Sequence, residues 1–478
     1  MNYKRVGYLS KLFFLFFLRN ILQVGILKKR SFRIILTGMF VLLATYLTVI
    51  MSFFFVDNNS SIKQTRIVLD IYVCMVTLFT FIVFLFMKIL FMKKNVFISI
   101  TMQLPVTKKE INTAILFYEM SITIMIVMGL CLSMSLAVII SNGIVLITRI
   151  ICNIIFSSIT VYFLLEFVYA VLNLLIEIFK LEKIKNVLLM SFLSAIFCYL
   201  YCEMIPLAFE KILYGYTEGR TTSQLVFYSY LMEKYHFVIA LIVFIVIVVI
   251  LGSCIIPMQG YQIKRNNSYI HILKKSKKNM SIFKVYVYAL IRNNETFSYY
   301  VISVCIYLIL KINRIENSIY SMAILTVNSI YVYVQTENIR FIILQKRYSL
   351  YRDYLYIIIS QLTYMFVFSF PVVMIELITH YDIKGIFILY LTMIGMVIIF
   401  SMVGIVFPAK QENPFSAIIG SGLVIVVFLL VGIAYMHINN KFVLYGSICV
   451  SEAVAITVSF LGMKKILYQN RCENRKGI

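Results

Sequence analysis

Long apolar stretches alternate with short polar segments along most of this chain, from about residue 33 onward. A bilayer core about 30 Å thick is crossed by a helix of about 20 mostly apolar residues. Divided into blocks of that length, the pattern predicts about twelve membrane-spanning helices. The expected spans are residues 33–56, 66–92, 111–140, 144–179, 186–208, 236–257, 297–312, 315–336, 354–379, 384–407, 416–437 and 442–463.

Composition agrees with this pattern. Hydrophobic residues make up 62% of the 478 residues and charged residues only 13%. A water-soluble fold of this size carries about twice that share of charged residues. The sequence therefore predicts an all-α integral membrane protein.

The lysines and arginines between the apolar blocks predict the topology. Cytoplasmic loops of membrane proteins are enriched in these residues. Here basic segments alternate with sparse ones, and the strongest cluster, between residues 264 and 284, includes the run KKSKK. The alternation places both termini in the cytoplasm. The formal charge of +24 is therefore mainly a topology signal, and it also attracts the chain to anionic lipid. The expected partner of these charges is the lipid bilayer, and nucleic-acid binding is not expected.

Near the N-terminus, a short apolar run between basic residues resembles a signal peptide but lacks a small-residue cleavage site. Residues 8–27 are instead expected to form an amphipathic helix in the membrane interface. The predicted organisation is a cytoplasmic N-terminus with this helix at 1–32, a six-helix half at 33–258, a basic linker with a second interfacial helix at 259–296, a six-helix half at 297–465 and a cytoplasmic tail at 466–478.

The two predicted halves each carry a polar cytoplasmic segment between their second and third spans. The first reads KNVFISITMQLPVTKKEI and the second ENIRFIILQKRYSLYRDY. Aligning Thr107 with Ser349 also aligns Gln103 with Gln345. The identity is low, but the shared position favours a pseudo-repeated chain.

The first of these segments encodes a break and a restart of a helix. Pro105 disfavours helical backbone at Leu104 and lacks an amide donor, so a helix leaving the second span should end near Gln103. Thr107 followed by Glu110 is the pattern of a capping box, which satisfies backbone amides at a new helix start.

The LPVTKKEI segment resembles the LPxSRxEI pattern of permease subunits of type-2 ABC exporters. In that family, an interfacial helix precedes the first of six spans, and the loop after the second span docks on a separate ATP-binding subunit. The resemblance implies that the coupling segment here comprises Leu104, Pro105, Val106, Thr107, Lys108, Lys109 and Glu110. The second-half counterpart, formed by Gln345, Lys346, Arg347, Ser349 and Arg352, departs from the pattern, because Arg347 replaces the proline and Arg352 the glutamate.

Energy for such a permease would come from a partner chain. The sequence contains no GxxxxGK[ST] motif, so ATP hydrolysis through a P-loop is not expected in this chain. The resemblance implies a separate ATP-binding cassette subunit in two copies, which would hold ATP and Mg²⁺, while this chain binds no cofactor of its own and is not an enzyme.

Carboxylates within predicted spans are the other candidate functional residues, because charges in hydrocarbon usually face a cavity or each other. The candidates are Glu119, Glu166, Glu203, Glu376 and Glu452. A path lined with them would suit a cationic peptide. The alternative is that Glu166 pairs with Asn173 or a tyrosine and only fixes packing. No metal site is expected, since Cys198 and Cys202 share a helix face without further ligands.

The sequence thus favours the permease subunit of an ATP-driven exporter, a multi-pass protein of a bacterial plasma membrane. Its cargo would be a hydrophobic or cationic peptide or an antimicrobial. An ion-gradient-driven transporter or flippase is the main alternative, although such proteins often break helices with Gly and Pro. A membrane glycan polymerase is a third, for which the loop 211–236 offers Glu218, Arg220 and Glu233 but no catalytic constellation.

Overall fold

The structure is a computed structural model in which the chain is helical. It describes residues 3–22, 30–57, 62–91, 106–180, 185–218, 224–258, 281–315, 318–337, 339–340, 349–380, 383–408, 446 and 449–464. No strand occurs in these ranges. The predicted all-α class is therefore confirmed for the described part of the chain.

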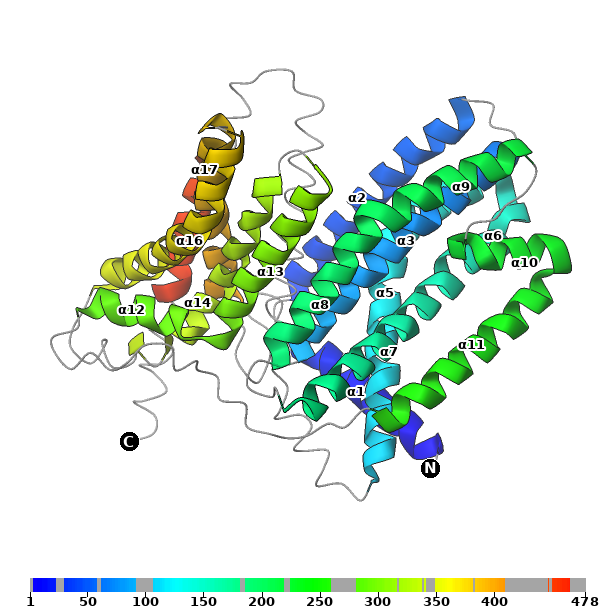
Figure 1. Cartoon of the computed structure of the whole chain (residues 1–478), viewed down its shortest axis with the longest axis horizontal. Coiled ribbons are helices and arrows are strands. Elements are labelled where there is room, and N and C mark those ends of the chain that lie inside the picture. Colours follow the sequence, from blue (N-terminus) through cyan, green and yellow to red (C-terminus); the bar gives the residue numbers. More distant parts are fainter. Residues whose placement is uncertain are drawn as a thin grey trace. The chain divides into compact units, whose positions relative to one another are not determined.

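The chain divides into two compact units. The first comprises Met1–Leu18 with Arg33–Lys264, and the second Arg19–Phe32 with Arg265–Ile478. The division between residues 264 and 265 falls within the predicted linker at 259–296. Figure 1 colours the helices of the first unit from blue to green and those of the second from yellow-green to red.

The helices of the first unit follow the predicted spans closely. Their bounds are α1 Tyr3–Leu22, α2 Arg30–Asp57, α3 Ile62–Phe91, α5 Lys108–Asn142, α6 Ile147–Ile150, η3 Ile151–Phe156, α7 Ser157–Ile178, α8 Lys185–Tyr199, η5 Leu200–Met204, α9 Ile205–Glu218, α10 Phe227–Tyr235 and α11 Phe237–Met258. Short 3₁₀ turns, η2 Gly143–Leu146 and η6 Gln224–Val226, precede α6 and α10.

Helix α3 is central to the first unit. It packs against both α5 and α7, and α7 in turn packs against α11. Phe81 and Phe84 of α3 are fully buried in a cluster with Tyr162 and Phe163 of α7. These aromatic side chains pack α3 against α7 over about one helical turn, where the rings of Phe84 and Tyr162 meet edge to face at 5.9 Å.

Two spans of the first unit contain a turn of π-helix. In η5 the cause is Pro206, two residues after the turn ends: a proline has no amide hydrogen to donate, and its ring clashes with the carbonyl four residues earlier. In η3 the hydroxyl of Ser157 bonds to the carbonyl of Cys152 at 3.2 Å. Turns of this kind often occur at functional sites, and η3 carries Asn153, a residue of the buried cluster described below.

The second unit contains a long 3₁₀ segment in place of an α-helix at the start of its second span. Its elements are α12 Ile282–Ile291, α13 Asn294–Ile312, η7 Ser318–Asn328, α14 Ser329–Gln335, α16 Leu350–His380 and α17 Ile383–Val406. Residues 449–464 are also helical. The predicted span 315–336 is thus occupied by η7 followed by the short helix α14.

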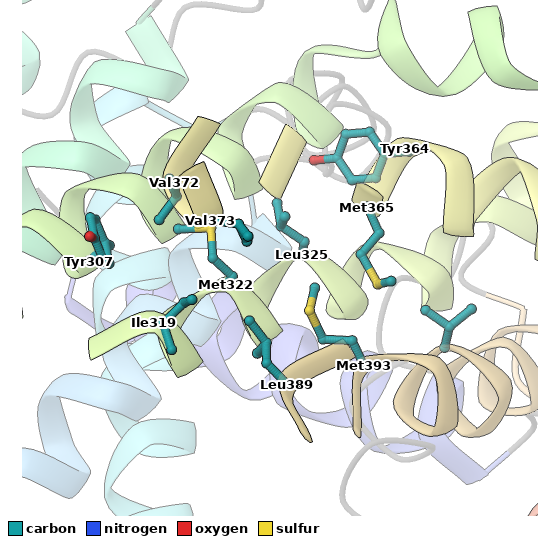
Figure 2. Packing of buried hydrophobic residues seen from close by; sticks show 11 residues of the cluster. Tyr307, Ile319, Met322, Leu325, Tyr364, Met365, Val372, Val373, Leu389 and Met393 are labelled. Atoms are coloured by element: carbon teal, nitrogen blue, oxygen red, sulfur yellow. The ribbon is translucent and has the colours of Figure 1, made fainter. Parts of the chain in front are cut away.

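The core of the second unit lies around η7. Figure 2 shows Met322 and Leu325 of η7 facing Leu389 and Met393 of α17, with Met365 of α16 beside them. All five side chains are fully buried. Methionine has three rotatable bonds and fills irregular gaps, which suits a core built against a 3₁₀ segment.

Helices α14 and α17 approach most closely at Gly404. A Cβ atom built on Gly404 would lie 2.9 Å from the carbonyl carbon of Ile330 and closer still to its oxygen. The neighbouring group is backbone, which cannot rotate away. Small residues permit this kind of close helix contact within membranes.

Replacing Gly404 with alanine should therefore destabilise the protein, because α14 and α17 must separate to admit the methyl group. We expect a loss of about 1–3 kcal/mol in the free energy of unfolding. The control is Gly252→Ala in α11, where the new Cβ would lie 3.7 Å from the ring of Phe163 and alanine improves helix propensity by about 1 kcal/mol. Thermal unfolding of both detergent-solubilised variants checks the contrast, and equal stability would contradict it.

Seven helices among the described residues are long and apolar enough to cross a membrane. They are Gln64–Lys88, Lys109–Asn142, Ile147–Ile178, Leu188–Tyr216, Phe237–Met258, Leu350–Thr379 and Ile383–Val406. Shorter apolar helices cover Thr37–Phe53, Ile282–Ile291 and Thr296–Ile312. The predicted span 416–437 lies outside the described residues, so the number twelve remains a prediction.

Candidate functional site

The start of α5 has the predicted capping box. The amide of Glu110 donates to Thr107 Oγ1 at 3.3 Å, and the amide of Thr107 donates to Glu110 Oε2 at 2.9 Å. Thr107 has extended backbone (φ −76°, ψ 151°), so the helix begins immediately after it. Lys109 is exposed and Val106 half-buried, whereas Leu104 and Pro105 lie outside the described residues.

The corresponding helix start in the second unit has only half of this arrangement. Ser349 Oγ accepts from the amide of Arg352 at 3.4 Å, the same spacing as Thr107 and Glu110. The guanidinium of Arg352 has no acceptor atom, so it cannot return a bond to the amide of Ser349. Gln345, Lys346 and Arg347 lie outside the described residues.

Each unit also packs a preceding amphipathic helix against the beginning of its third span. In the first unit Phe13 and Phe17 of α1 meet Tyr118 of α5, both edge to face at 6.0 Å. In the second unit Tyr286 of α12 lies 5.9 Å from Tyr356 of α16 and donates a hydrogen bond to Asp353. Burial, and then the Asp353 charge, raise the pKa of Tyr286, so its hydroxyl remains a donor.

Two of the predicted carboxylates, Glu119 and Glu166, meet at one lysine. Lys88 Nζ lies 2.8 Å from Glu119 Oε2 and 2.6 Å from Glu166 Oε2. All three side chains are at most 4% exposed. We call Lys88, Glu119 and Glu166 the inner ionic cluster, and it joins α3, α5 and α7 at a single point.

Aromatic rings complete the surroundings of that lysine. Lys88 Nζ lies 4.7 Å from the ring centre of Tyr169 and 5.3 Å from that of Phe84. Ring faces attract a cation, and more strongly in a desolvated site. Asn173, the alternative partner considered for Glu166, directs its amide to Glu177 at 3.5 Å.

The second unit has a neutral network at the matching position. Gln361 lies as far beyond Ser349 as Glu119 lies beyond Thr107. Its Oε1 accepts from Asn328 Nδ2 at 3.0 Å, which links α16 to η7 as Glu119 and Lys88 link α5 to α3. Both amides are fully buried. The two units thus share a polar link between their second and third spans, ionic in the first and uncharged in the second.

The remaining predicted glutamates do not come together. Glu376 accepts from Tyr307 at 2.7 Å and from Lys311 at 2.8 Å, which ties α16 to α13. Glu452 lies against α17, where its Oε1 would be 2.6 Å from a Cβ built on Gly395. Glu203, in the π-turn η5, is exposed. Glu376 and Glu452 therefore make separate contacts, and Glu203 lies at the surface of the described part of its unit.

A second buried cluster was not predicted from the sequence. Arg149 of α6 donates from Nε to Asp70 Oδ1 at 2.9 Å and from Nη2 to Asp70 Oδ2 at 2.5 Å, a two-point contact with α3. Tyr216 of α9 also donates to Asp70, at 2.7 Å, as does Asn153 of η3, at 2.9 Å. Arg149 and Asp70 are no more than 2% exposed.

Helix α10 joins this cluster through two residues. Ser229 donates to the side chain of Asn153, and Glu233 accepts from Arg149 Nη1 at 2.5 Å. Arg66 of α3 also approaches Glu233, at 3.8 Å. We call Asp70, Arg149, Asn153, Tyr216 and Glu233 the arginine cluster. Of the loop residues considered for a polymerase, Glu233 therefore has a structural partner, while the side chains of Glu218 and Arg220 lie outside the described residues.

The sequence did contain a signal for both clusters. Lys88 and Asp70 fall within the predicted span 66–92, and Arg149 falls within 144–179. Each is an ionisable residue where hydrocarbon is expected, which is itself a pointer to function. The predicted candidates were all glutamates, so Lys88, Asp70 and Arg149, which supply the ion pairs, were not among them.

Comparison of the chain with models of protein families, with curated proteins and with solved structures finds no match in any of the three. Within the described ranges, no group of three or more His, Cys, Asp and Glu side chains could hold a metal ion. The described part of the chain is all-helical, and its long apolar helices indicate a membrane protein. Charged clusters are buried between these helices.

Proposed function

We propose that this chain is the membrane-spanning permease of an ATP-driven exporter, coupled to a separate ATP-binding subunit. The observation that carries the proposal is the helix start at Thr107, where a capping box fixes the beginning of α5 directly after the LPV of the coupling pattern. The packing of α1 on that same helix supports it.

The proposed topology has about twelve spans in two six-helix halves, with both termini inside a bacterial plasma membrane. The alternation of basic loops and the corresponding packing of α1 on α5 and of α12 on α16 support this arrangement. The proposed cargo is a hydrophobic or cationic peptide, or an antimicrobial.

The inner ionic cluster gives a physical route for coupling. A motor that moves the start of α5 would move Glu119, and Lys88 and Glu166 would follow because a buried ion pair is costly to break. Helices α3 and α7 would therefore move with α5. In the second unit, the half-formed cap at Ser349 would provide a weaker grip for the motor.

A gradient-driven transporter is the second candidate. The π-turns in two spans and the ionisable cluster buried among α3, α5 and α7 favour it. In that case the cluster would bind the coupling ion, and no ATPase would be required.

The test is purification of the tagged chain from its native cells in mild detergent. We expect an ATP-binding subunit to co-purify with the wild-type protein. Replacing Thr107, Lys108, Lys109 and Glu110 with Gly and Ser should release that subunit while the chain stays monodisperse, because the helix cap that is lost is worth about 1 kcal/mol. The matched control is Ser349→Gly with Arg352→Ser, which should release less.

Absence of any ATP-binding subunit under these gentle conditions, together with transport that follows a proton or sodium gradient, would reject the exporter in favour of the second candidate. If the Gly/Ser variant still binds the ATP-binding subunit, the proposal of an ATP-driven exporter stands, but residues 107–110 are rejected as the docking segment.

A further inference from the structure

The carboxylate of Glu233 occupies a position between two arginines. Its Oε1 lies 2.5 Å from Arg149 Nη1 and 3.8 Å from Arg66 Nη1. Guanidinium groups recognise carboxylates through paired N–H donors. Two of them directed at one carboxylate oxygen make a site that fits a carboxylate.

The buried pair formed by Arg149 and Asp70 is neutral without Glu233. The charge of Arg149 is already balanced by Asp70, which engages two of its nitrogens. Arg149 and Asp70 are almost completely buried, whereas Glu233 is 36% exposed. Nη1 of Arg149, whose other nitrogens are held by Asp70, therefore faces the Glu233 carboxylate at the boundary with solvent.

The second guanidinium has donor capacity left over. Arg66 Nε is buried with no hydrogen-bond partner among the described residues, and 3.8 Å is too long for a hydrogen bond from its Nη1 to Glu233. A buried donor without a partner is costly. The Arg66 side chain is 41% exposed, so a ligand carboxylate placed between its Nη1 and Arg149 Nη1 would accept from both, which Glu233 does not.

Removal of Glu233 from this position needs only a side-chain rotation. Helix α10 is held by other contacts: Tyr228 and Leu231 are buried against Phe156 and Ala240, and Ser229 bonds Asn153. Because Glu233 is partly exposed, its carboxylate can turn into solvent while the helix stays in place.

We propose that Arg149 and Arg66 form a binding site for a carboxylate-bearing ligand, which Glu233 occupies in this conformation as an internal substitute. Asp70, Asn153 and Tyr216 position Arg149, and Arg66 supplies the second fork. The site requires no ATP-binding subunit, so it does not depend on the proposed exporter function.

The experiment uses the full chain in detergent and sodium acetate as the probe, against sodium chloride at equal ionic strength. Glu233→Ala empties the site, and we expect saturating acetate to raise its thermal unfolding midpoint by about 2–4 °C. The wild-type protein should not respond, because its own carboxylate competes. Adding Arg66→Ala to Glu233→Ala should abolish the response.

A second variant covers the case in which Glu233→Ala does not fold. Glu233→Gln keeps the volume of the side chain but removes its charge, so acetate should displace the neutral amide and stabilise this variant in the same direction, by a smaller amount. Lack of an acetate response in the folded variants would overturn the proposal, as would a response that survives the loss of Arg66. Stronger stabilisation by inorganic phosphate than by acetate would replace the carboxylate with a phosphate, such as that of a lipid headgroup.

Discussion

Replacing Asp70 with asparagine should lower the free energy of unfolding by about 3–5 kcal/mol, the usual cost of breaking a buried ion pair, because Arg149 then keeps only Glu233, which is 36% exposed, as a charged partner. The guanidinium of Arg149 is 2% exposed and loses the only described carboxylate that engages two of its nitrogens. The double variant Asp70→Leu with Arg149→Met should recover part of the loss, because it also removes the buried guanidinium that Glu233 alone would have to balance.

The chain contains no tryptophan, so unfolding is best followed with a thiol-reactive fluorogenic dye. Cys152, fully buried in η3, is shielded while the arginine cluster holds and reacts once it opens, provided that the exposed Cys254 and Cys449 are first replaced with serine. The control is Glu177→Gln, because Glu177 pairs with Lys185 at 3.0 Å with both side chains about a quarter exposed. Such a pair contributes about 0–1 kcal/mol. A loss for Asp70→Asn no larger than for this control would refute the structural importance of the cluster.

Removal of Lys88 should have the largest effect in the inner ionic cluster. Lys88→Met takes the shared ammonium from two buried carboxylates at once, and we expect a loss of about 3–5 kcal/mol. Glu119→Gln or Glu166→Gln leaves the lysine with the other carboxylate and an amide neighbour, so each should cost about 1–3 kcal/mol.

The order of the unfolding midpoints decides this prediction. Lys88→Met should have the lowest unfolding midpoint, well below those of Glu119→Gln and Glu166→Gln. A matched change in the second unit, Gln361→Leu, should have a midpoint between those of the glutamine variants and the wild type, because it breaks only neutral hydrogen bonds. If a glutamine variant unfolds before Lys88→Met, the ammonium is not the common centre of the cluster.

The all-helical class and most helix positions followed from the apolar pattern, because hydrocarbon requires every backbone group to bond within its own helix. The start of α5 followed from Thr107 and Glu110 because capping depends on residues three positions apart. These features depend on residues that are close together in the sequence, so they can be predicted from the sequence alone.

The clusters are not local. Asp70 and Arg149 are 79 residues apart, and Lys88 and Glu119 are 31 apart. Their pairing depends on which faces of α3, α5, α6 and α7 meet, which the apolar pattern does not determine. The 3₁₀ segment η7, which occupies the first part of the predicted span 315–336, could not be predicted either, because tertiary packing decides between two kinds of helix of similar composition.

The neutral pair formed by Asn328 and Gln361 has a consequence for how the membrane voltage acts on the protein. A transmembrane potential does about 2.3 kcal/mol of work per elementary charge moved through 100 mV, and it does almost none on an amide. The first unit carries an ion pair at the link between its second and third spans, whereas the corresponding link among the described residues of the second unit joins two amides. If both links lie within the bilayer and both move during the working cycle, the membrane voltage would drive or resist the movement in the first unit alone. Electrical recordings could therefore distinguish the motions of two units that share one chain.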